Sequence, residues 1–441
     1  MMRKHLRWAI AIAAIYSSAP SAHADDWPQW MGPNRDGVWA ETGIVDSFPA
    51  DGPKVLWRAK VSGGYGGPSV ANGKVYVMDY VTDADNKGEI YERPKIKGKE
   101  RVSCLDAKSG KEIWAQSYDC EYAISFPNGP RVTPTVADGK VYTVGAEGNL
   151  NCFDAETGKV IWSKEFKKDY KAKTPIWGFC GHPLVAGKMV YVITGGEGAC
   201  VVALDKDTGK EMWKALTAEE PGYSCPTLIE AGGAKQLLVW HSSSLNSLNP
   251  ETGEKLWTVL LKAEYKMSIM APRKLGDYLF VGGIYDQSVL LKLASDRPAV
   301  TEVWRGKKGN SIMPVNMTPL LDDGHIYGVN QPGQFIAVKL ENGERVWETT
   351  EPVTGKGSKP VDSATAFLVK NGDRYFLFNE KGELVIAKLS PKGYEEVSRA
   401  KVIEQTNLAF GRNVVWSHPA FANKCAFIRN DKEIICVSLA K

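Results

Sequence analysis

Eight side chains that could bind a ligand stand at equivalent places along the chain, each at or just before the Pro or small residue that begins a short apolar run. They are Tyr65, Arg131, His182, Tyr223, Arg273, Asn316, Asp362 and His418. Two imidazoles and two guanidinium groups around one pore would suit an anionic ligand. The alternative interpretation is that these polar groups only hydrogen-bond loop backbone or channel water.

A second set of candidates lies close to the first. Trp177, Phe179, Arg412 and Trp416 come just upstream of it, and short turns carry Glu147, Glu197, Asp286, Asn330 and Glu380. Glu147 and Glu197 are candidate calcium ligands, but such a site needs a third oxygen donor, and turn solvation is the alternative. The sequence holds no nucleophile with an adjacent base, no phosphate loop and no metal-ligand cluster, so hydrolysis and phosphoryl transfer have no support.

The elements that would position these residues follow from an internal repeat of eleven residues. It occurs as CLDAKSGKEIW (104–114), CFDAETGKVIW (152–162), ALDKDTGKEMW (203–213), SLNPETGEKLW (247–257) and AVKLENGERVW (337–347). AKLSPKGYEEV (387–397) keeps the length, and near Trp304 the glycine turn is replaced by Arg297-Pro298. In CFDAETGKVIW, Asp154 and Thr157-Gly158 most simply shape a turn.

Each copy follows a second signature, exemplified by TPTVADGKVYTVG (133–145), so a unit is expected to form four short strands, A to D, joined by tight turns. The unit tryptophans are Trp57, Trp114, Trp162, Trp213, Trp257, Trp304 and Trp347. They and Val397 recur every 43 to 57 residues, the spacing of propeller blades. The pattern predicts an all-β, eight-bladed propeller of four-stranded antiparallel blades over residues 52–441.

The eighth blade decides how the ring closes. Residues 416–440 supply strands A to C of that blade, and GPKVLW (52–57) supplies the missing outer strand. Pairing the N-terminal strand with the C-terminal blade removes the exposed sheet edges. Because strands alternate in direction, the A–B and C–D turns share one face, which we call the turn face. The opposite, loop-rich face carries the long connections 80–100, 115–130, 163–182, 258–270, 305–317, 348–363 and 398–417. We expect a binding site there.

The chain begins with a predicted signal peptide, residues 1–24, in which Arg3, Lys4 and Arg7 precede a short apolar run and Ala22-His23-Ala24 forms a cleavage signal. We therefore expect a periplasmic or secreted protein without a transmembrane segment and without a lipid-anchor cysteine. Those three basic residues account for most of the net charge of +4, which argues against nucleic acid or an anionic membrane as partner. We expect a monomer.

Two further segments have structural and functional interpretations. Residues 25–51 form a tryptophan-rich extension, in which Trp27, Trp30 and Trp39 plug or brace a surface or form an aromatic platform. The charged insert 83–101 forms a solvated hairpin or a docking arm. The eight cysteines are scattered and most are expected to be core residues. If Asn430-Asp431 is a two-residue turn, Cys425 and Cys436 face each other across a hairpin, where a disulfide would be strained.

The repeated A/C-x-D-x-x-T-G-x-x-x-W unit resembles the tryptophan-docking motif of the pyrroloquinoline-quinone (PQQ) repeat propellers, and WPQWMGPNRDGV (27–38) resembles the leader of exported quinoprotein-like propellers. The resemblance covers nearly all of the chain beyond residue 24. It implies that the tryptophans pack between blades. Some members of this family are dehydrogenases that hold PQQ and calcium, whereas BamB-like members are scaffolds without a quinone.

The resemblance leaves two functions open. The first is an exported, non-catalytic propeller that binds a protein or a small ligand through the loop-rich face, with a BamB-like assembly role. The alternative is a PQQ- and calcium-dependent oxidoreductase acting on an alcohol or sugar, in which the cofactor supplies the chemistry. The sequence lacks the adjacent cysteine pair and the CxxCH haem motif of the alcohol dehydrogenase branch.

Overall fold

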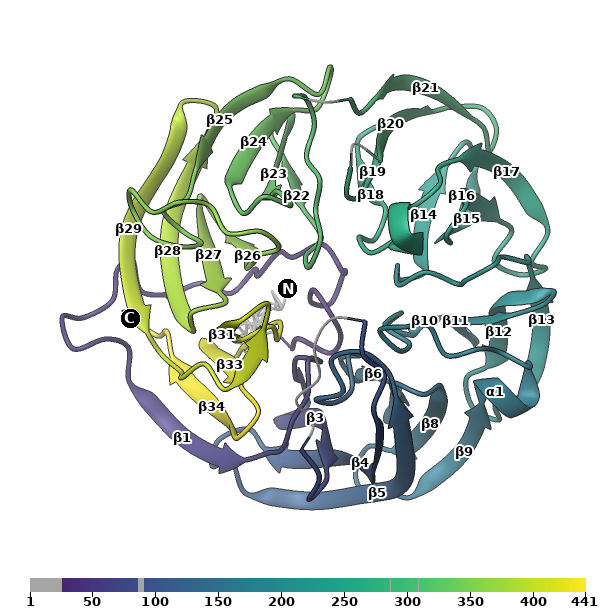
Figure 1. The fold of residues 1–441 in the computed structure, drawn as a ribbon, viewed down its shortest axis with the longest axis horizontal. Coiled ribbons are helices and arrows are strands. Elements are labelled where there is room, and N and C mark those ends of the chain that lie inside the picture. The colour runs from purple at the N-terminus through teal and green to yellow at the C-terminus, as the bar shows by residue number, and fades with distance from the viewer. Residues whose placement is uncertain (1–25, 86–90, 286, 308) are drawn as a thin grey trace, which may run out of the picture.

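Eight four-stranded antiparallel sheets stand in a ring around a central axis in the computed structural model, which describes residues 26–85, 91–285, 287–307 and 309–441 (Figure 1). This arrangement confirms the predicted eight-bladed propeller. The predicted signal peptide and the candidate turn residue Asp286 lie outside the described residues.

Successive blades follow the chain, each from its inner strand A to its outer strand D. Blades 1 and 2 contain β2 (Ser69–Ala71), β3 (Lys74–Val81), β4 (Lys95–Asp106) and β5 (Glu112–Ala123), then β6 (Thr135–Ala137), β7 (Lys140–Val144), β8 (Asn149–Asp154) and β9 (Val160–Glu165). Blades 3 and 4 contain β10 (Leu184–Ala186), β11 (Met189–Gly196), β12 (Ala199–Asp205) and β13 (Glu211–Ala215), then β14 (Thr227–Ala231), β15 (Ala234–Trp240), β16 (Ser244–Leu248) and β17 (Lys255–Leu260).

The second half of the ring repeats this order. Blades 5 and 6 contain β18 (Arg273–Leu275), β19 (Tyr278–Gly282), β20 (Ser288–Leu293) and β21 (Val300–Arg305), then β22 (Leu320–Asp322), β23 (His325–Val329), β24 (Phe335–Lys339) and β25 (Arg345–Thr349). Blades 7 and 8 contain β26 (Ala366–Asn371), β27 (Arg374–Asn379), β28 (Glu383–Ser390) and β29 (Gly393–Lys401), then β32 (Ala420–Ala422), β33 (Cys425–Arg429), β34 (Glu433–Ser438) and β1 (Val55–Lys60).

Three small elements lie in the loops between blades. They are the helix α1 (Phe166–Asp169), the 3-10 turn η1 (Glu264–Lys266) and the hairpin of β30 (Asn407–Ala409) with β31 (Arg412–Val414). Neither helical element of the described chain is long and apolar enough to cross a membrane.

Ring closure joins the two ends of the propeller, as the sequence predicted. Strand β1 pairs antiparallel with β34, where Trp57 lies opposite Cys436. The buried Arg429 secures the neighbouring seam, because its guanidinium donates to the carbonyl of Met78 in the first blade and to that of Ser62 in the connection leading to it. Blade 8 thereby gains its outer strand and loses an exposed edge.

The two cysteines of the last hairpin are not directly opposite each other, although they are diagonal neighbours whose side chains interact. The amide of Asn430 donates to the carbonyl of Glu433 at 3.0 Å, so the two-residue turn consists of Asp431 and Lys432 rather than of Asn430 and Asp431. This register places Cys425 opposite Ser438 and Phe427 opposite Cys436. All eight cysteines are free thiols in this structure.

The repeated tryptophans join neighbouring blades by a common contact. The Nε1 of Trp162 donates to the carbonyl of Lys206 in the next blade at 3.0 Å, and the Trp162 ring lies against Gly209 of the same turn. Trp57, Trp114, Trp213, Trp304 and Trp347 also donate to a carbonyl of the following blade. Trp257 instead donates to Gln236 of its own blade, because blade 5 has Arg297-Pro298 in place of the glycine turn.

In the repeats that carry an aspartate, this residue holds the turn that receives the tryptophan. The carboxylate of Asp154 accepts hydrogen bonds from the amide and the hydroxyl of Thr157, at 2.8 and 2.7 Å. These hydrogen bonds lower the pKa of Asp154 from its ordinary value. Asp205 and Thr208 repeat the arrangement in the next blade. The carboxylates of the repeat therefore have an architectural partner on the turn face.

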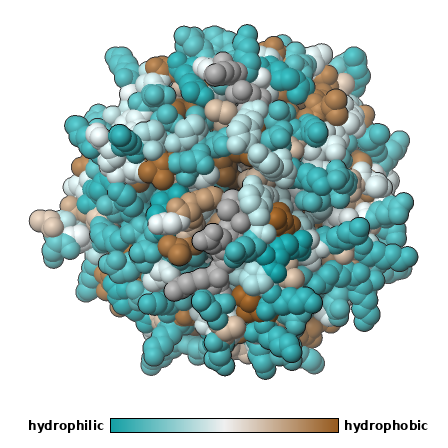
Figure 2. Space-filling view, viewed as in Figure 1, coloured by the Kyte–Doolittle hydropathy of each residue, from teal (hydrophilic) through white to brown (hydrophobic). Residues whose placement is uncertain are grey.

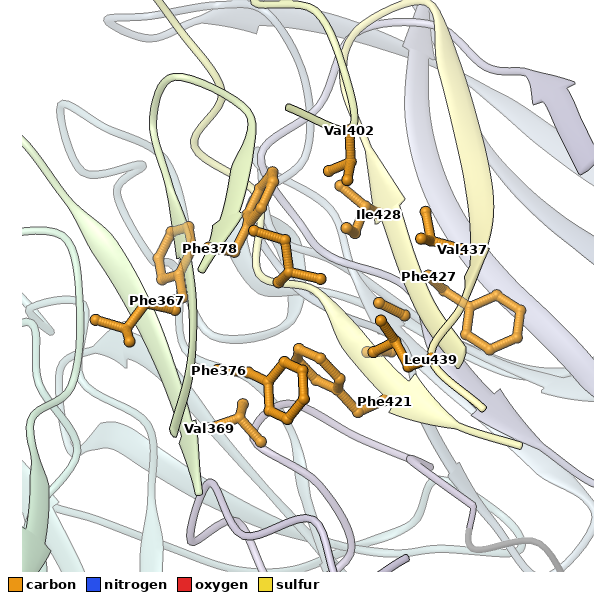
Figure 3. Close-up of a cluster of buried hydrophobic side chains, with 14 of the residues drawn as sticks. Phe367, Val369, Phe376, Phe378, Val402, Phe421, Phe427, Ile428, Val437 and Leu439 are labelled. Carbon is orange, nitrogen blue, oxygen red and sulfur yellow. The ribbon is translucent and has the colours of Figure 1, made fainter. Parts of the chain in front are cut away.

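Blades pack face to face through nearly continuous apolar strands. Figure 3 shows the contact between blades 7 and 8, where Phe376 of one sheet approaches Phe421 of the other, whereas Phe427 points to the opposite side of its sheet. The rings of Phe376 and Phe421 have centroids 5.8 Å apart. Strands buried on both faces explain why alternating polar residues are absent from the inner part of each unit.

The N-terminal extension runs across the turn face and is part of the fold. Trp27 exchanges backbone hydrogen bonds with Val70, and Trp39 donates to the carbonyl of Lys370. Trp27 and Trp39 are buried, and both contact the ring of Phe421. Residues 26–44 therefore brace the neighbouring blades 7, 8 and 1.

Candidate functional site

The loop-rich face contains a central cavity of about 320 Å³. Figure 2 shows hydrophobic residues gathered beside the hollow at the centre of this view. Every one of the seven long connections contributes to its lining, including Tyr91 from the charged insert. The ring of blades thus brings together segments that are far apart in the chain.

Most of the predicted candidates line this cavity. The structure places there Tyr65, Arg131, Trp177, His182, Tyr223, Asn316, Asp362, Trp416 and His418. Arg273 and Arg412 are not among the lining residues, and Phe179 packs against Phe166 instead. Without Arg273 and Arg412, the cavity lining has less positive charge than the sequence suggested.

Arg273 holds the N-terminal extension rather than a ligand. Its Nη1 and Nη2 donate to the carbonyls of Arg35 and Asp36, at 2.6 and 2.7 Å. Desolvation lowers its pKa to about 10, so the group remains a cation at neutral pH. The positive charge of Arg273 therefore interacts with the N-terminal extension and not with the cavity.

Arg412 organises the rim of the cavity. Its Nε donates to Glu380 at 2.8 Å, and its guanidinium lies over the ring of Phe410. The other carboxylate oxygen of Glu380 accepts a hydrogen bond from the indole of Trp416 at 3.0 Å. Glu380, a turn candidate in the sequence, is therefore the buried acceptor that orients a lining tryptophan.

Arg131 is the cation within the lining, and much of its hydrogen-bonding capacity is already used. It donates to the carbonyls of Gly129, Ser125 and Phe126. Its guanidinium also lies 5.0 Å from the centroid of the Tyr65 ring. Backbone carbonyls thus compete with any anionic ligand for this side chain.

The N-terminal extension supplies the floor of the cavity. Trp30 stacks on His182, with ring centroids 5.0 Å apart, and meets His418 edge-on at 5.9 Å. His182 Nδ1 accepts a hydrogen bond from the amide of Thr133, and His418 packs on Phe367. Trp30 therefore bridges blades 3 and 8 and blocks the channel from the turn face.

Burial keeps both floor histidines neutral. Desolvation lowers the pKa of His418 to about 3, and it lowers that of His182 well below the ordinary value, assisted by the charge of Arg35. The cavity thus holds two uncharged imidazoles at neutral pH. The four cations suggested by the sequence do not converge on one ligand.

Aromatic side chains form the wall. Eleven of them line the cavity: Trp30, Tyr65, Tyr91, Phe126, Trp177, Tyr223, Tyr265, Tyr285, Phe367, Phe410 and Trp416. Phe126, Phe410 and Trp416 contact one another at about 6 Å, and Tyr265 lies 6.0 Å from Tyr285. The result is an apolar wall edged by hydroxyl and indole groups.

Five rim aromatics have left-handed backbone conformations. Tyr91, Phe126, Tyr265, Tyr285 and Phe410 have φ between 48° and 71°. In the described chain these are all the Phe, Tyr and Trp residues with positive φ, and all five line the cavity. A bulky side chain in this region costs about 1–2 kcal/mol, and such strain clusters at binding sites.

Sequence reasoning missed this rim. Phe126, Tyr265, Tyr285 and Phe410 follow no repeat, because each stands in a connection of different length. Left-handed geometry leaves no signature at a tyrosine or phenylalanine, unlike at glycine. The usable signal was the presence of aromatic residues on loops expected to be exposed.

The two candidate calcium ligands are not arranged as a metal site. Glu147 is buried and accepts hydrogen bonds from the amide of Ala123, from Lys167 and from Thr174. Glu197 is exposed on the turn after β11. The described residues contain no group of three or more His, Cys, Asp or Glu side chains that could hold a metal ion.

Comparison with known proteins places this geometry in a family. A family model described as "Outer membrane protein assembly factor BamB" matches residues 98–349 and again 241–441, more than half of the chain. The chain belongs to this BamB family of PQQ-like propellers. The predicted family resemblance is therefore confirmed.

Individual relatives of this BamB-family chain are distant. The outer membrane protein assembly factor BamB of Shewanella oneidensis is 24% identical over 200 residues, which are 43% of this chain and 48% of that protein. The chain spans about half the length of the curated BamB relatives it matches.

Solved structures share the fold. BamB of Moraxella catarrhalis has a TM-score of 0.55 at 15% identity, over 88% of this chain and 99% of that chain. Quinohemoprotein alcohol dehydrogenase of Comamonas testosteroni has a TM-score of 0.59 at 12% identity, over 94% and 81%. Scaffold and dehydrogenase propellers thus match the fold about equally well, and function must be argued from the site.

Proposed function

We propose that this BamB-family chain is an exported, non-catalytic binding and scaffold propeller that takes its partner through the loop-rich face. The observation that carries the proposal is the strained aromatic rim. Tyr265, Tyr285 and Phe410 keep left-handed backbones and remain 56, 50 and 45% exposed. A folded protein gains no core packing from such residues, so a partner that covers them explains both their strained backbones and their exposure.

The rest of the fold fits a scaffold. Ring closure pairs β1 with β34, so the blades form one rigid support for the seven variable loops. The predicted signal peptide supports action in the periplasm or outside the cell. The name of the curated relatives, outer membrane protein assembly factor, supports a protein partner in the cell envelope. The proposed unit is the monomer.

The residues present do not fit the PQQ- and calcium-dependent alternative. Calcium needs several oxygen ligands, whereas the described residues hold no such cluster and Glu147 is committed to three donors. The carboxylates of a quinone would need cations, but Arg131 is the arginine or lysine of the lining and is engaged by carbonyls. We therefore favour binding over oxidation.

Site-specific photo-crosslinking in the producing cells tests the scaffold role. A photoreactive residue is placed at Tyr285 on the rim and, as matched control, at Met212 on outer strand β13, since both side chains are 50% exposed. A discrete adduct with an envelope protein or ligand from position 285 and none from position 212 is expected. Equal labelling at both positions, or none at 285, contradicts the proposal.

A second experiment separates the enzyme alternative. Purified protein is mixed with PQQ and Ca²⁺, and quinone uptake and dye-linked oxidation of alcohols and sugars are measured. We expect neither. Stoichiometric uptake together with oxidation overturns the non-catalytic assignment.

A further inference from the structure

We propose that the central cavity is a binding site for a short, uncharged saccharide. This inference rests on the proposed binding function of the loop-rich face and names the chemistry of its ligand. The cavity, at about 320 Å³, lies at the lower end of the range of small-ligand sites. Its floor, wall and charge each restrict what can enter.

The wall presents ring faces with polar edges. Eight of the eleven lining aromatics are Tyr or Trp, each with one hydroxyl or indole N–H. Tyr265 and Tyr285 form an exposed pair on one side, and Phe126, Phe410 and Trp416 form a triad of rings in the same lining. A sugar ring has apolar C–H faces and a hydroxyl perimeter, so it complements a surface of this kind.

The charge of the site favours an uncharged ligand. His182 and His418 are neutral, and Arg131 already donates to three backbone carbonyls. Arg273 and Arg412 are held by the extension and by Glu380. An anion entering this cavity would lose hydration without finding a free cation, which is costly in an enclosed site.

One polar group in the lining lacks a partner. The indole Nε1 of Trp30 is buried and has no hydrogen-bond partner among the described residues, whereas the buried hydroxyls of Tyr65 and Tyr223 interact with the side chain of Asn407 and the backbone of Trp177. Buried polar groups are normally paired, so unsatisfied ones that line a cavity indicate a ligand or water. Burial raises the pKa of Tyr65 to about 12, so this hydroxyl keeps its proton and can donate.

The rim adds acceptors for hydroxyl groups. Asp362 is exposed at the mouth, and Asn316 uses its amide nitrogen on the carbonyl of Ser363, which leaves its oxygen toward other donors. Hydroxyl donors and acceptors spread around apolar faces suit a polyol. An extended peptide would need a sheet edge to pair with, whereas in the described chain Phe367 is the one lining residue that stands in a strand.

Calorimetric titration with defined probes tests the inference. The probes are maltose, cellobiose and N,N′-diacetylchitobiose, with inorganic phosphate as the charged comparison. We expect one-to-one binding of at least one disaccharide and no heat from phosphate. Because no ion pair forms, the affinity should stay the same between about 50 and about 500 mM NaCl.

Variants place the binding in the cavity. The double variant Tyr265→Ala/Tyr285→Ala removes one aromatic pair and should weaken binding about tenfold or more. Tyr285→Phe keeps the ring and should have a smaller effect. The control Met212→Ala changes an equally exposed side chain on β13 and should leave the affinity unchanged. Circular dichroism confirms that each variant is folded.

Contrary outcomes are distinguishable. If no disaccharide binds but an aromatic-rich peptide does, and the rim variants abolish that binding, the saccharide inference is overturned and the proposed function stands. Binding that falls steeply with salt, or competition by phosphate, also overturns it. If nothing binds and position 285 gives no photo-adduct, both proposals fail.

Discussion

The indole of Trp30 lies flat on the imidazole of His182, with ring centroids 5.0 Å apart and planes inclined by 11°. Trp30 belongs to the N-terminal extension and His182 to the loop that enters blade 3. This contact turns an open channel into a cup whose floor comes from another part of the chain. It links the stability of the extension to the protonation of the binding site.

Trp30→Ala should destabilise the protein by about 3–5 kcal/mol and raise the pKa of His182 toward its ordinary value, because water would reach the imidazole. Urea unfolding and NMR titration of the imidazole resonances measure the two effects. Trp39→Ala removes an equally buried indole of the same extension that has no recorded contact with His182, so it should cost stability alone. An unchanged His182 pKa in Trp30→Ala contradicts the stacking role.

His418 should make the protein less stable as the pH falls. Its folded-state pKa is lowered to about 3, below the ordinary value of 6.5, so below pH 6.5 the unfolded chain binds a proton that the folded chain rejects. His418→Gln removes this titration. The stability of the wild type relative to the variant should therefore drop by about 2 kcal/mol between pH 7 and pH 5. If the difference in unfolding free energy between the wild type and His418→Gln does not change with pH in urea unfolding, His418 is not held neutral by burial.

Gly158→Ala should destabilise more than Gly139→Ala. Both glycines have φ near +71°, so each substitution carries the same left-handed strain. An added Cβ at Gly158 would lie 2.6 Å from the Trp114 ring of the preceding blade, whereas at Gly139 nothing lies within 4 Å. The extra cost should be about 1–3 kcal/mol. Equal losses in thermal or urea unfolding would show that tryptophan docking contributes little.

Tyr285→Gly should remove partner binding without lowering the melting temperature. The residue is 50% exposed with φ of 53°, so glycine relieves about 1 kcal/mol of backbone strain. Leu260→Gly is the control, because Leu260 is 75% exposed but belongs to strand β17, where glycine costs up to about 1 kcal/mol. Scanning calorimetry measures the change in melting temperature of both variants. A clear loss of stability in Tyr285→Gly argues that its ring is structural.

The architecture could be predicted because its determinants are local and repeated. The turn held by Asp154 and Thr157 needs only neighbours within three residues, and the same few letters recur in successive blades. Trp162 then has one place to pack, between its own strand and the next turn. Ring closure by β1 followed from counting strands, and loop length identified the face that carries the cavity.

The site depended on contacts that no local pattern records. Arg273 and Arg131 stand at equivalent positions in the sequence. In the structure, Arg273 binds backbone carbonyls of the N-terminal extension, whereas Arg131 binds backbone carbonyls of a loop. His182 and His418 lost their charge through burial, which only packing determines. The rim formed because four long connections of unrelated length and the short turn between β19 and β20 meet around one axis. The sequence by itself determined the blades, their order and their closure, whereas the tertiary structure decided which side chains share the cavity, since burial and competing hydrogen bonds act only after the ring has closed.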